Sequence, residues 1–366
     1  MDVIDLSVGE PDIGTPTFAI DAAKKAIDSG LTKYTAADGI PELRAAILRD
    51  AESRLGVFPE KTATIVGAGA KHVIFNALMA SLNPGDEVII PRPYWVSYPA
   101  IVTLLQGAPV IPGQQDSKTS KLTPQELSAS LTPKTKWLIL NSPSNPSGLA
   151  YTKDELAAFG EILKDYPHVM IMSDDIYKDL SFEEVPHIAT VCPFLKDRLF
   201  IVDGPSKAFS MTGWRIGFGL GPSDLIAAMR RLQSQQTSNA CSIAQYATLE
   251  TFKHQKEWHP FIQNLFKERK DFMREKLSGI GLDSPNPAGA FYLYANCQAF
   301  LNKKTPEGRT LETDNDFAEA LLQEANVCVV PGAAFGLSPF VRISYAAEQK
   351  TLAKAVKQIS EFLNRL

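Results

Sequence analysis

The chain has 366 residues, of which 45% are hydrophobic and 21% are charged, a composition typical of a globular protein with room for one large and one smaller domain. Its net charge of −4 at pH 7 lacks the basic excess of nucleic-acid-binding proteins, so we expect no nucleic-acid partner. No apolar run reaches membrane-spanning length, and the four cysteines and five histidines show no metal-ligand spacing. We therefore expect no membrane or metal partner and a cytoplasmic location.

Strand-like runs alternate with helical patterns from about residue 62 to 232, which predicts a mainly parallel sheet with helices on both faces. The first strand, residues 63–66, is followed by the small-residue turn Gly67-Ala68-Gly69-Ala70-Lys71 and by a helical run over 72–82. Backbone N–H groups at such a helix start bind phosphate, and the helix dipole favours the anion. The turn is a candidate phosphate site, although many ordinary strand–helix junctions have a similar one.

The next two long strands end in polar side chains. Residues 136–140 lead into Asn145, which prolines and a glycine hold in a rigid turn. The apolar run that begins at His168 leads to Asp174 and Tyr177. Functional groups gather at the carboxyl ends of strands in open α/β sheets, so we expect these three side chains near one another. Asp174 has the chemistry to keep a pyridine nitrogen protonated, although an isolated aspartate here would be interpreted as a turn residue or helix N-cap.

The segment after the strand at 199–202 carries a lysine and an arginine in apolar surroundings, Lys207 and Arg215. A lysine in a partly dry pocket loses proton affinity, and its amine becomes a nucleophile for an aldehyde. Arg215 offers a permanent positive fork for a phosphate. An aldehyde that carries a phosphate is pyridoxal 5′-phosphate (PLP), so the pair indicates this cofactor. Taken alone, Lys207 would be interpreted as an ordinary surface lysine.

The C-terminal part is predicted to contain a long helix over 251–277, a strand over 289–294, an exposed polar loop over 302–315, a strand over 340–344 and a final helix ending at 366. Arg342 lies within the last strand. An inward-facing arginine is costly without an anionic partner, and a carboxylate can satisfy it with two hydrogen bonds. Arg342 is therefore a candidate for binding a substrate carboxylate.

In this order the motifs resemble those of the class I (fold type I) PLP-dependent aminotransferases, and most of all the bacterial aspartate aminotransferase branch. The resemblance runs from Gly9-Glu10-Pro11-Asp12 to Arg342-Ile343-Ser344-Tyr345. It implies an α/β fold in which residues 51–280 form a large PLP-binding domain with a mainly parallel sheet. Residues 1–50 and 281–366 would form a smaller α/β domain. It also implies a homodimer with shared active sites.

The resemblance implies three catalytic residues. Lys207 would form the Schiff base and carry the proton, Asp174 would pair with the pyridine nitrogen, and Tyr177 would hydrogen-bond the phenolic oxygen. The rest of the cofactor-binding set holds the phosphate, stacks on the ring or contacts the phenolic oxygen: Ala70, Lys71, Trp95, Asn145, Ser206 and Arg215. Tyr34, with Thr237 and Ser238 as weaker candidates, would reach the phosphate bound by the other subunit.

Substrate binding is assigned to Gly9, Lys71, Trp95, Asn145 and Arg342. Arg342 would bind the α-carboxylate, and Gly9 would allow close approach of the backbone. A lysine at position 71 is associated in the resembled branch with the side-chain carboxylate of aspartate or glutamate. The positive end of a helix mildly disfavours a lysine, which is consistent with an anionic partner there.

The expected activity is transfer of the amino group of aspartate or glutamate to a 2-oxo acid, by a ping-pong cycle. Another amino-acid specificity, including aromatic acids or prephenate, is an alternative. A PLP-dependent carbon–sulfur lyase is a further alternative, because it shares the lysine, aspartate, tyrosine and arginine.

Overall fold

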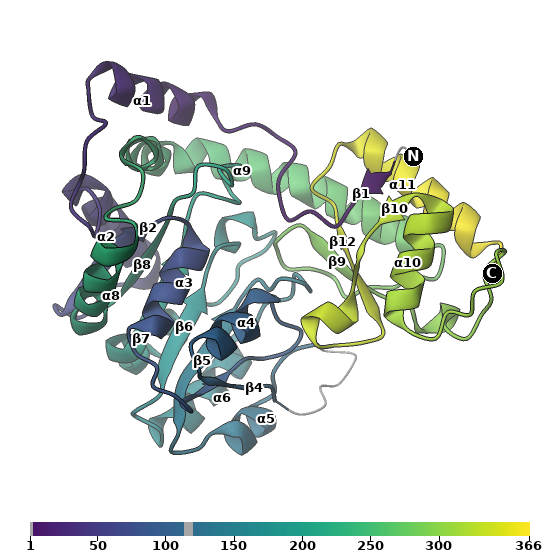
Figure 1. Ribbon diagram of the computed structural model, residues 1–366, viewed down its shortest axis with the longest axis horizontal. Helices are drawn as coiled ribbons and strands as arrows, with labels where there is room; N and C mark the ends of the chain where they lie inside the picture. Colours follow the sequence, from purple (N-terminus) through teal and green to yellow (C-terminus); the bar gives the residue numbers. More distant parts are fainter. Residues whose placement is uncertain (1–2, 113–119) are drawn as a thin grey trace.

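The computed structural model describes residues 3–112 and 120–366. The main sheet of the described chain has seven strands in the order β2-β8-β7-β6-β5-β3-β4. β8 is antiparallel to both of its neighbours, and the other pairs are parallel, which confirms a mainly parallel sheet (Figure 1). Its strands are β2 (Thr62–Gly67), β3 (Glu87–Ile89), β4 (Ala108–Val110), β5 (Thr135–Asn141), β6 (Met170–Asp174), β7 (Leu199–Asp203) and β8 (Gly217–Pro222).

Both faces of this sheet are covered, because alternate side chains of each strand pack on opposite sides. In β5, Trp137 and Ile139 join one apolar cluster, and Leu138 and Leu140 join another. Strands buried on both faces have continuous apolar sequences, as β7 does, in which every residue is buried. The helices of this part are α3 (Ala70–Met79), α4 (Ser97–Leu104), α5 (Pro124–Ser130), α6 (Lys153–Lys164), α7 (Ile188–Val191) and α8 (Ser223–Gln236).

A second body lies at the other end of the long helix α9 (Ser242–Ser278) (Figure 1). It contains an antiparallel sheet in the order β11-β12-β9 and the parallel pair β1-β10. Because β1 pairs with β10, the N-terminal segment is part of this body. Its elements are β1 (Ile4–Asp5), β9 (Tyr292–Asn296), α10 (Asp314–Ala325), β10 (Val327–Cys328), β11 (Val330–Pro331), β12 (Phe340–Ser344) and α11 (Gln349–Leu363).

Among the predicted boundaries that differ from the structure, those of α9 and β9 differ for local reasons. α9 begins at Ser242 rather than at 251, because its first turns bury small and polar residues that give a weak apolar pattern. β9 begins at Tyr292 rather than at 289, because Ala290 has a φ of 61°, a left-handed conformation that a strand cannot contain. The strand predicted over 340–344 matches β12.

Residues 17–55 pack against the main sheet and α9. α1 (Thr17–Asp28) buries Ala19 and Ala23 beside Ala247 of α9. α2 (Pro41–Leu55) buries Leu43 and Ile47 in a cluster with the main sheet. The division at residues 50 and 280 stays a prediction, and these contacts favour placing 17–50 with the large domain. No helix among the described residues is long and apolar enough to cross a membrane.

Candidate active site

A cavity of about 420 Å³ opens beside the carboxyl ends of β5 and β6, between the main sheet and the second body. Every residue predicted to bind cofactor or substrate lines it, with the exception of Tyr34 and the weaker candidates Thr237 and Ser238. These lining residues are Gly9, Ala70, Lys71, Trp95, Asn145, Asp174, Tyr177, Ser206, Lys207, Arg215 and Arg342. Residues from both ends of the sequence therefore meet at the sheet edge where α/β proteins place their ligands.

Lys207 is largely buried, and its Nζ donates a hydrogen bond to the Gly9 carbonyl oxygen at 2.6 Å. Burial lowers the pKa of Lys207 to about 8. The positive charges of Arg215 and Arg342 lower this pKa further, whereas the negative charge of Glu10 raises it. A lysine with such a pKa has a substantial neutral fraction near neutral pH. Its amine is then available to attack an aldehyde.

Asp174 ends β6 and is 4% exposed. Its Oδ2 accepts a hydrogen bond from the Tyr98 hydroxyl at 2.6 Å, and its Oδ1 accepts one from the Ile176 N–H at 3.2 Å. Burial raises the pKa of Asp174 to about 6, and the hydrogen bond from Tyr98 opposes that rise. Asp174 therefore acts as the turn residue considered from the sequence, through its Oδ1. The same carboxylate lines the cavity, and with a pKa of about 6 it is ionised at neutral pH.

Arg342 projects from β12 into the cavity and is 7% exposed. Its Nη1 donates to Asn145 Oδ1 at 2.9 Å, and its Nη2 donates to the Ser7 carbonyl oxygen at 2.6 Å. Its Nε is buried and has no hydrogen-bond partner among residues 3–112 and 120–366. None of the described residues forms an ion pair with Arg342, so the buried guanidinium retains both the charge and a free donor for a ligand carboxylate.

Two tyrosines lie beside this arginine. The Tyr177 and Tyr292 hydroxyls are 3.0 Å apart, and the guanidinium carbon of Arg342 lies 4.4 Å from the centroid of the Tyr292 ring. Burial raises the pKa of both phenols. They therefore remain neutral hydrogen-bond donors.

The turn between β2 and α3 lies against Arg215. Gly69 has a φ of 97°, and a Cβ atom there would come within 2.5 Å of Arg215 Nη2. A Cβ at Gly217 would lie 2.3 Å from the Ala70 backbone nitrogen. The glycines thus permit a close approach that puts a guanidinium beside the N–H groups at the start of α3. This donor set suits a phosphate dianion.

Lys71 and Trp95 also line the cavity. Lys71 Nζ lies 4.9 Å from the centroid of a Trp95 ring, a cation–π contact. The same indole and the Tyr98 ring meet in a T-shaped contact, with ring centroids 5.3 Å apart and an interplanar angle of 86°. An exposed ammonium at the cavity mouth is available to an anionic ligand group.

Tyr34, Thr237 and Ser238 lie outside the cavity. Tyr34 is 88% exposed, and Thr237 and Ser238 are exposed just after α8. Their proposed contact with a second subunit stays a prediction.

Sequence reasoning missed three residues of the site. Tyr98 and Tyr292 contact Asp174 and Tyr177 as described above. Asn141 donates from Nδ2 to the Asp174 carbonyl oxygen at 2.8 Å and links the ends of β5 and β6. The signal for Tyr98 was its place three residues after Trp95, and the signal for Asn141 was its place at a strand end.

PLP fits these residues. The cavity holds an amine of lowered pKa for the aldehyde, a buried carboxylate for the ring nitrogen, and a guanidinium with a helix start for the phosphate. The buried, unpartnered Nε of Arg342 leaves a place for the carboxylate of an amino acid.

Comparison with known proteins agrees with this geometry. The family model described as "Aminotransferase class I and II" matches residues 1–359. The chain belongs to this family. Its members use PLP, so the protein is a PLP-dependent aminotransferase.

Relatives of this aminotransferase align over almost the whole chain. The aspartate/prephenate aminotransferase of Cereibacter sphaeroides is 50% identical over 364 residues, which is 99% of this chain and 91% of the relative. The crystal structure of the aspartate aminotransferase from Rhizobium meliloti has a TM-score of 0.95 and 44% identity, covering 100% of this chain and 92% of that one. The structure of the Thermus thermophilus aspartate aminotransferase with maleate has a TM-score of 0.90 and 36% identity, covering 99% of this chain and 92% of that one. The aminotransferase therefore has the α/β fold type I architecture.

Proposed function

We propose that this aminotransferase transfers the amino group of aspartate or glutamate to a 2-oxo acid. The observation that carries the proposal is that Arg342 and Lys71 line one cavity with Lys207, so two cations are available for the two carboxylates of the substrate. The names of the relatives support it. The maleate in the Thermus thermophilus structure is also a four-carbon dicarboxylate.

When bound, PLP supplies an aldehyde that takes up the amino nitrogen and a ring that withdraws electrons from the substrate's α-carbon. Arg342 orients the substrate by its α-carboxylate, and Lys71 contacts the side-chain carboxylate. The neutral amine of Lys207 takes the proton from the α-carbon as a general base. Asp174 holds the proton on the ring nitrogen.

The remaining residues position these groups. Tyr177 and Asn145 would donate hydrogen bonds to the phenolic oxygen of the cofactor, and the Asn145 amide oxygen accepts a hydrogen bond that fixes Arg342. Trp95 would cover the cofactor ring and exclude water, and the backbone of Gly9 lies close to Lys207. Ser206 and Arg215, with the N–H groups of Ala70 and Lys71, would hold the phosphate.

Prephenate is a second candidate amino acceptor, because a relative at 50% identity carries it in its name. Prephenate has two carboxylates, one of them on a 2-oxo acid side chain, and the same two cations suit it. The carbon–sulfur lyase alternative has no support among these relatives.

The test is a pair of half-reactions followed by absorbance. Aspartate should convert the visible band of the bound cofactor to the ultraviolet band of its amine form, and 2-oxoglutarate or prephenate should restore the visible band. Cystathionine should release no pyruvate. Absence of any change with aspartate or glutamate would reject the proposed substrates.

We further propose a homodimer in which Tyr34, with Thr237 and Ser238, reaches the phosphate site of the partner. The 88% exposure of the Tyr34 ring supports this role, since a large aromatic side chain in water is a frequent interface residue. A mixed dimer of Tyr34→Phe and Lys207→Ala subunits tests it. Its one intact Lys207 lies in the Tyr34→Phe subunit and faces the unchanged Tyr34 of the Lys207→Ala subunit, so this site should hold PLP as tightly as a wild-type site, whereas a Tyr34→Phe homodimer should lose PLP faster. An intact-Lys207 site in the mixed dimer that loses PLP as fast as the Tyr34→Phe homodimer would contradict the shared site. The cytoplasmic location stays a prediction of the sequence.

A further inference from the structure

We propose that Tyr98 is a positioning residue that holds the Asp174 carboxylate in place as an anion, ready for the ring nitrogen of the cofactor. The inference rests on the proposed role of Asp174. It assigns to α4 a part in the electron-withdrawing chemistry of the site, beyond the contact between the ring and Trp95.

The geometry begins with one short buried hydrogen bond. Tyr98 is 3% exposed, and its hydroxyl donates to Asp174 Oδ2 at 2.6 Å. The Ile176 N–H donates to Oδ1 at 3.2 Å. Each carboxylate oxygen therefore accepts one hydrogen bond, from a different element of the fold. The plane of the carboxylate is fixed, and each oxygen keeps a second lone pair for a ligand.

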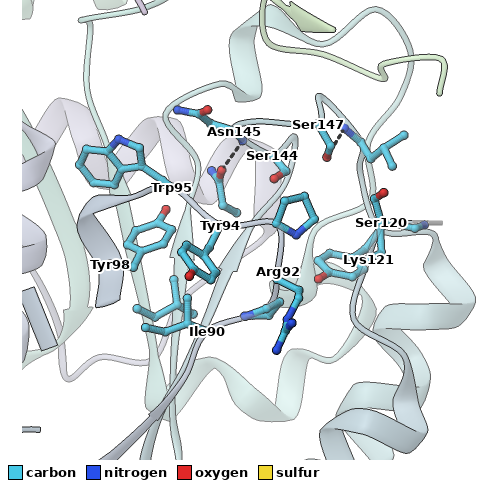
Figure 2. Close-up of a pocket in the computed structure, with 16 residues that line it drawn as sticks. Ile90, Arg92, Tyr94, Trp95, Tyr98, Ser120, Lys121, Ser144, Asn145 and Ser147 are labelled. Atoms are coloured by element: carbon cyan, nitrogen blue, oxygen red, sulfur yellow. Dashed lines mark hydrogen bonds between the residues drawn. The ribbon is translucent and has the colours of Figure 1, made fainter. Parts of the chain in front are cut away.

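The same tyrosine also contacts the indole of Trp95. The two rings meet edge to face with centroids 5.3 Å apart, and Figure 2 shows them side by side on the wall of a small neighbouring pocket. Tyr98, in the first turn of α4, thus touches both Trp95, which would cover the cofactor ring, and Asp174, which would bind its nitrogen. Removing the Tyr98 hydroxyl alone abolishes its hydrogen bond to Asp174 and leaves the ring contact with Trp95 in place.

The surroundings of Asp174 explain why the donor is needed. Burial disfavours the carboxylate anion, and the negative charge of Asp175 adds to this effect, whereas Lys207 and the Tyr98 hydroxyl stabilise the anion. The neutral phenol of Tyr177 contributes no charge. Removing the Tyr98 hydroxyl takes away the largest favourable contribution, so the pKa of Asp174 should rise above its value of about 6.

The substitution Tyr98→Phe tests this while keeping the aromatic contact with Trp95. The measurement is the affinity of the full-length protein, freed of cofactor, for pyridoxine 5′-phosphate between about pH 5 and 9. This ligand has the phosphate and the ring nitrogen but no aldehyde, so no bond to Lys207 forms. Its own ionisations are the same for both proteins and cancel when the two affinities are compared.

The ratio of wild-type to variant affinity should increase about tenfold as the pH falls through this range, since one pKa unit on Asp174 corresponds to a factor of ten. In an Asp174→Asn background, Tyr98→Phe should produce no such pH dependence. The control is Tyr151→Phe, which removes the hydroxyl of another buried tyrosine, 7% exposed, on the wall of the small pocket. The ratio of wild-type to Tyr151→Phe affinity should stay constant as the pH changes.

A ratio for Tyr98→Phe that is the same at every pH would overturn the inference, because a packing role weakens binding uniformly. That result would leave the proposed function intact. Failure of the wild-type protein itself to bind pyridoxine 5′-phosphate would reject the cofactor site, and the role of Tyr98 with it.

Discussion

Arg342 and Asn145 are joined by a buried hydrogen bond of 2.9 Å between Nη1 and Oδ1. The bond connects β12 of the second body to the turn that follows β5 of the main sheet. It couples the proposed carboxylate-binding arginine to a residue proposed to contact the cofactor's phenolic oxygen. Substrate binding at Arg342 and the orientation of Asn145 are therefore interdependent.

Arg342→Met should reduce kcat/KM for aspartate by about a hundredfold or more, since it removes two hydrogen bonds to a carboxylate, each contributing about 1.5–3 kcal/mol. The visible band of the bound cofactor should remain. Steady-state kinetics and an absorbance spectrum check both points. Arg365→Met, at an exposed arginine near the C-terminus, is the control and should leave kcat/KM unchanged. An equally unaffected Arg342→Met enzyme would show that another group binds the α-carboxylate.

Lys71→Ser should reduce kcat/KM for aspartate by about ten- to a hundredfold, the scale of one charge-assisted hydrogen bond. Alanine and phenylalanine should be affected far less, because neither has a side-chain carboxylate. Parallel assays with the three amino acids measure the difference, and Lys61→Ser, at an exposed lysine just before β2, serves as control. Equal losses for acidic and neutral substrates would assign Lys71 to the phosphate or the fold.

Lys207 should make the cofactor-free protein less stable at neutral pH. Its pKa of about 8 in the folded chain lies below the ordinary value of 10.5, so the unfolded chain binds the proton more tightly. The destabilisation is complete below about pH 8 and disappears as the pH rises through 10.5. Lys207→Met should raise the free energy of unfolding by up to about 3 kcal/mol at neutral pH and by much less near pH 10.

Urea unfolding of the two cofactor-free proteins at both pH values measures this difference. Lys270→Met is the comparison, because this buried lysine is paired with Asp271 and has no such reason to be destabilising. A stability difference for Lys207→Met that does not change with pH would mean that the lysine is not held in an unfavourable charged state.

The sequence was sufficient to predict which polar residues lie at the strand ends beside the cavity. Asp174 and Asn145 follow long apolar runs, and polar residues after such runs indicate the ligand edge of a parallel sheet. Lys207 and Arg215 could be assigned to the same site because an amine for an aldehyde and a guanidinium for a phosphate together indicate PLP. These signals are local in the chain, so no knowledge of packing was needed.

Contacts between distant segments could not be predicted in the same way. The Tyr98–Asp174 hydrogen bond joins residues 76 positions apart, and it depends on the rotation of α4 about its axis. The packing of α1 and α2 on the large domain depends on which of several apolar surfaces each helix covers. An amphipathic pattern shows that a face is buried but does not identify its partner.

The central claim is that Lys207 holds PLP and moves the proton during transamination. The measurement that tests it most directly is the absorbance spectrum of Lys207→Ala and of the wild-type protein, each with PLP, before and after addition of aspartate. We expect the wild-type visible band to disappear on addition of aspartate, and the variant to show neither that band nor turnover while its far-ultraviolet circular dichroism remains native. A variant that retains the visible band and turns over aspartate at nearly the wild-type rate would contradict the account.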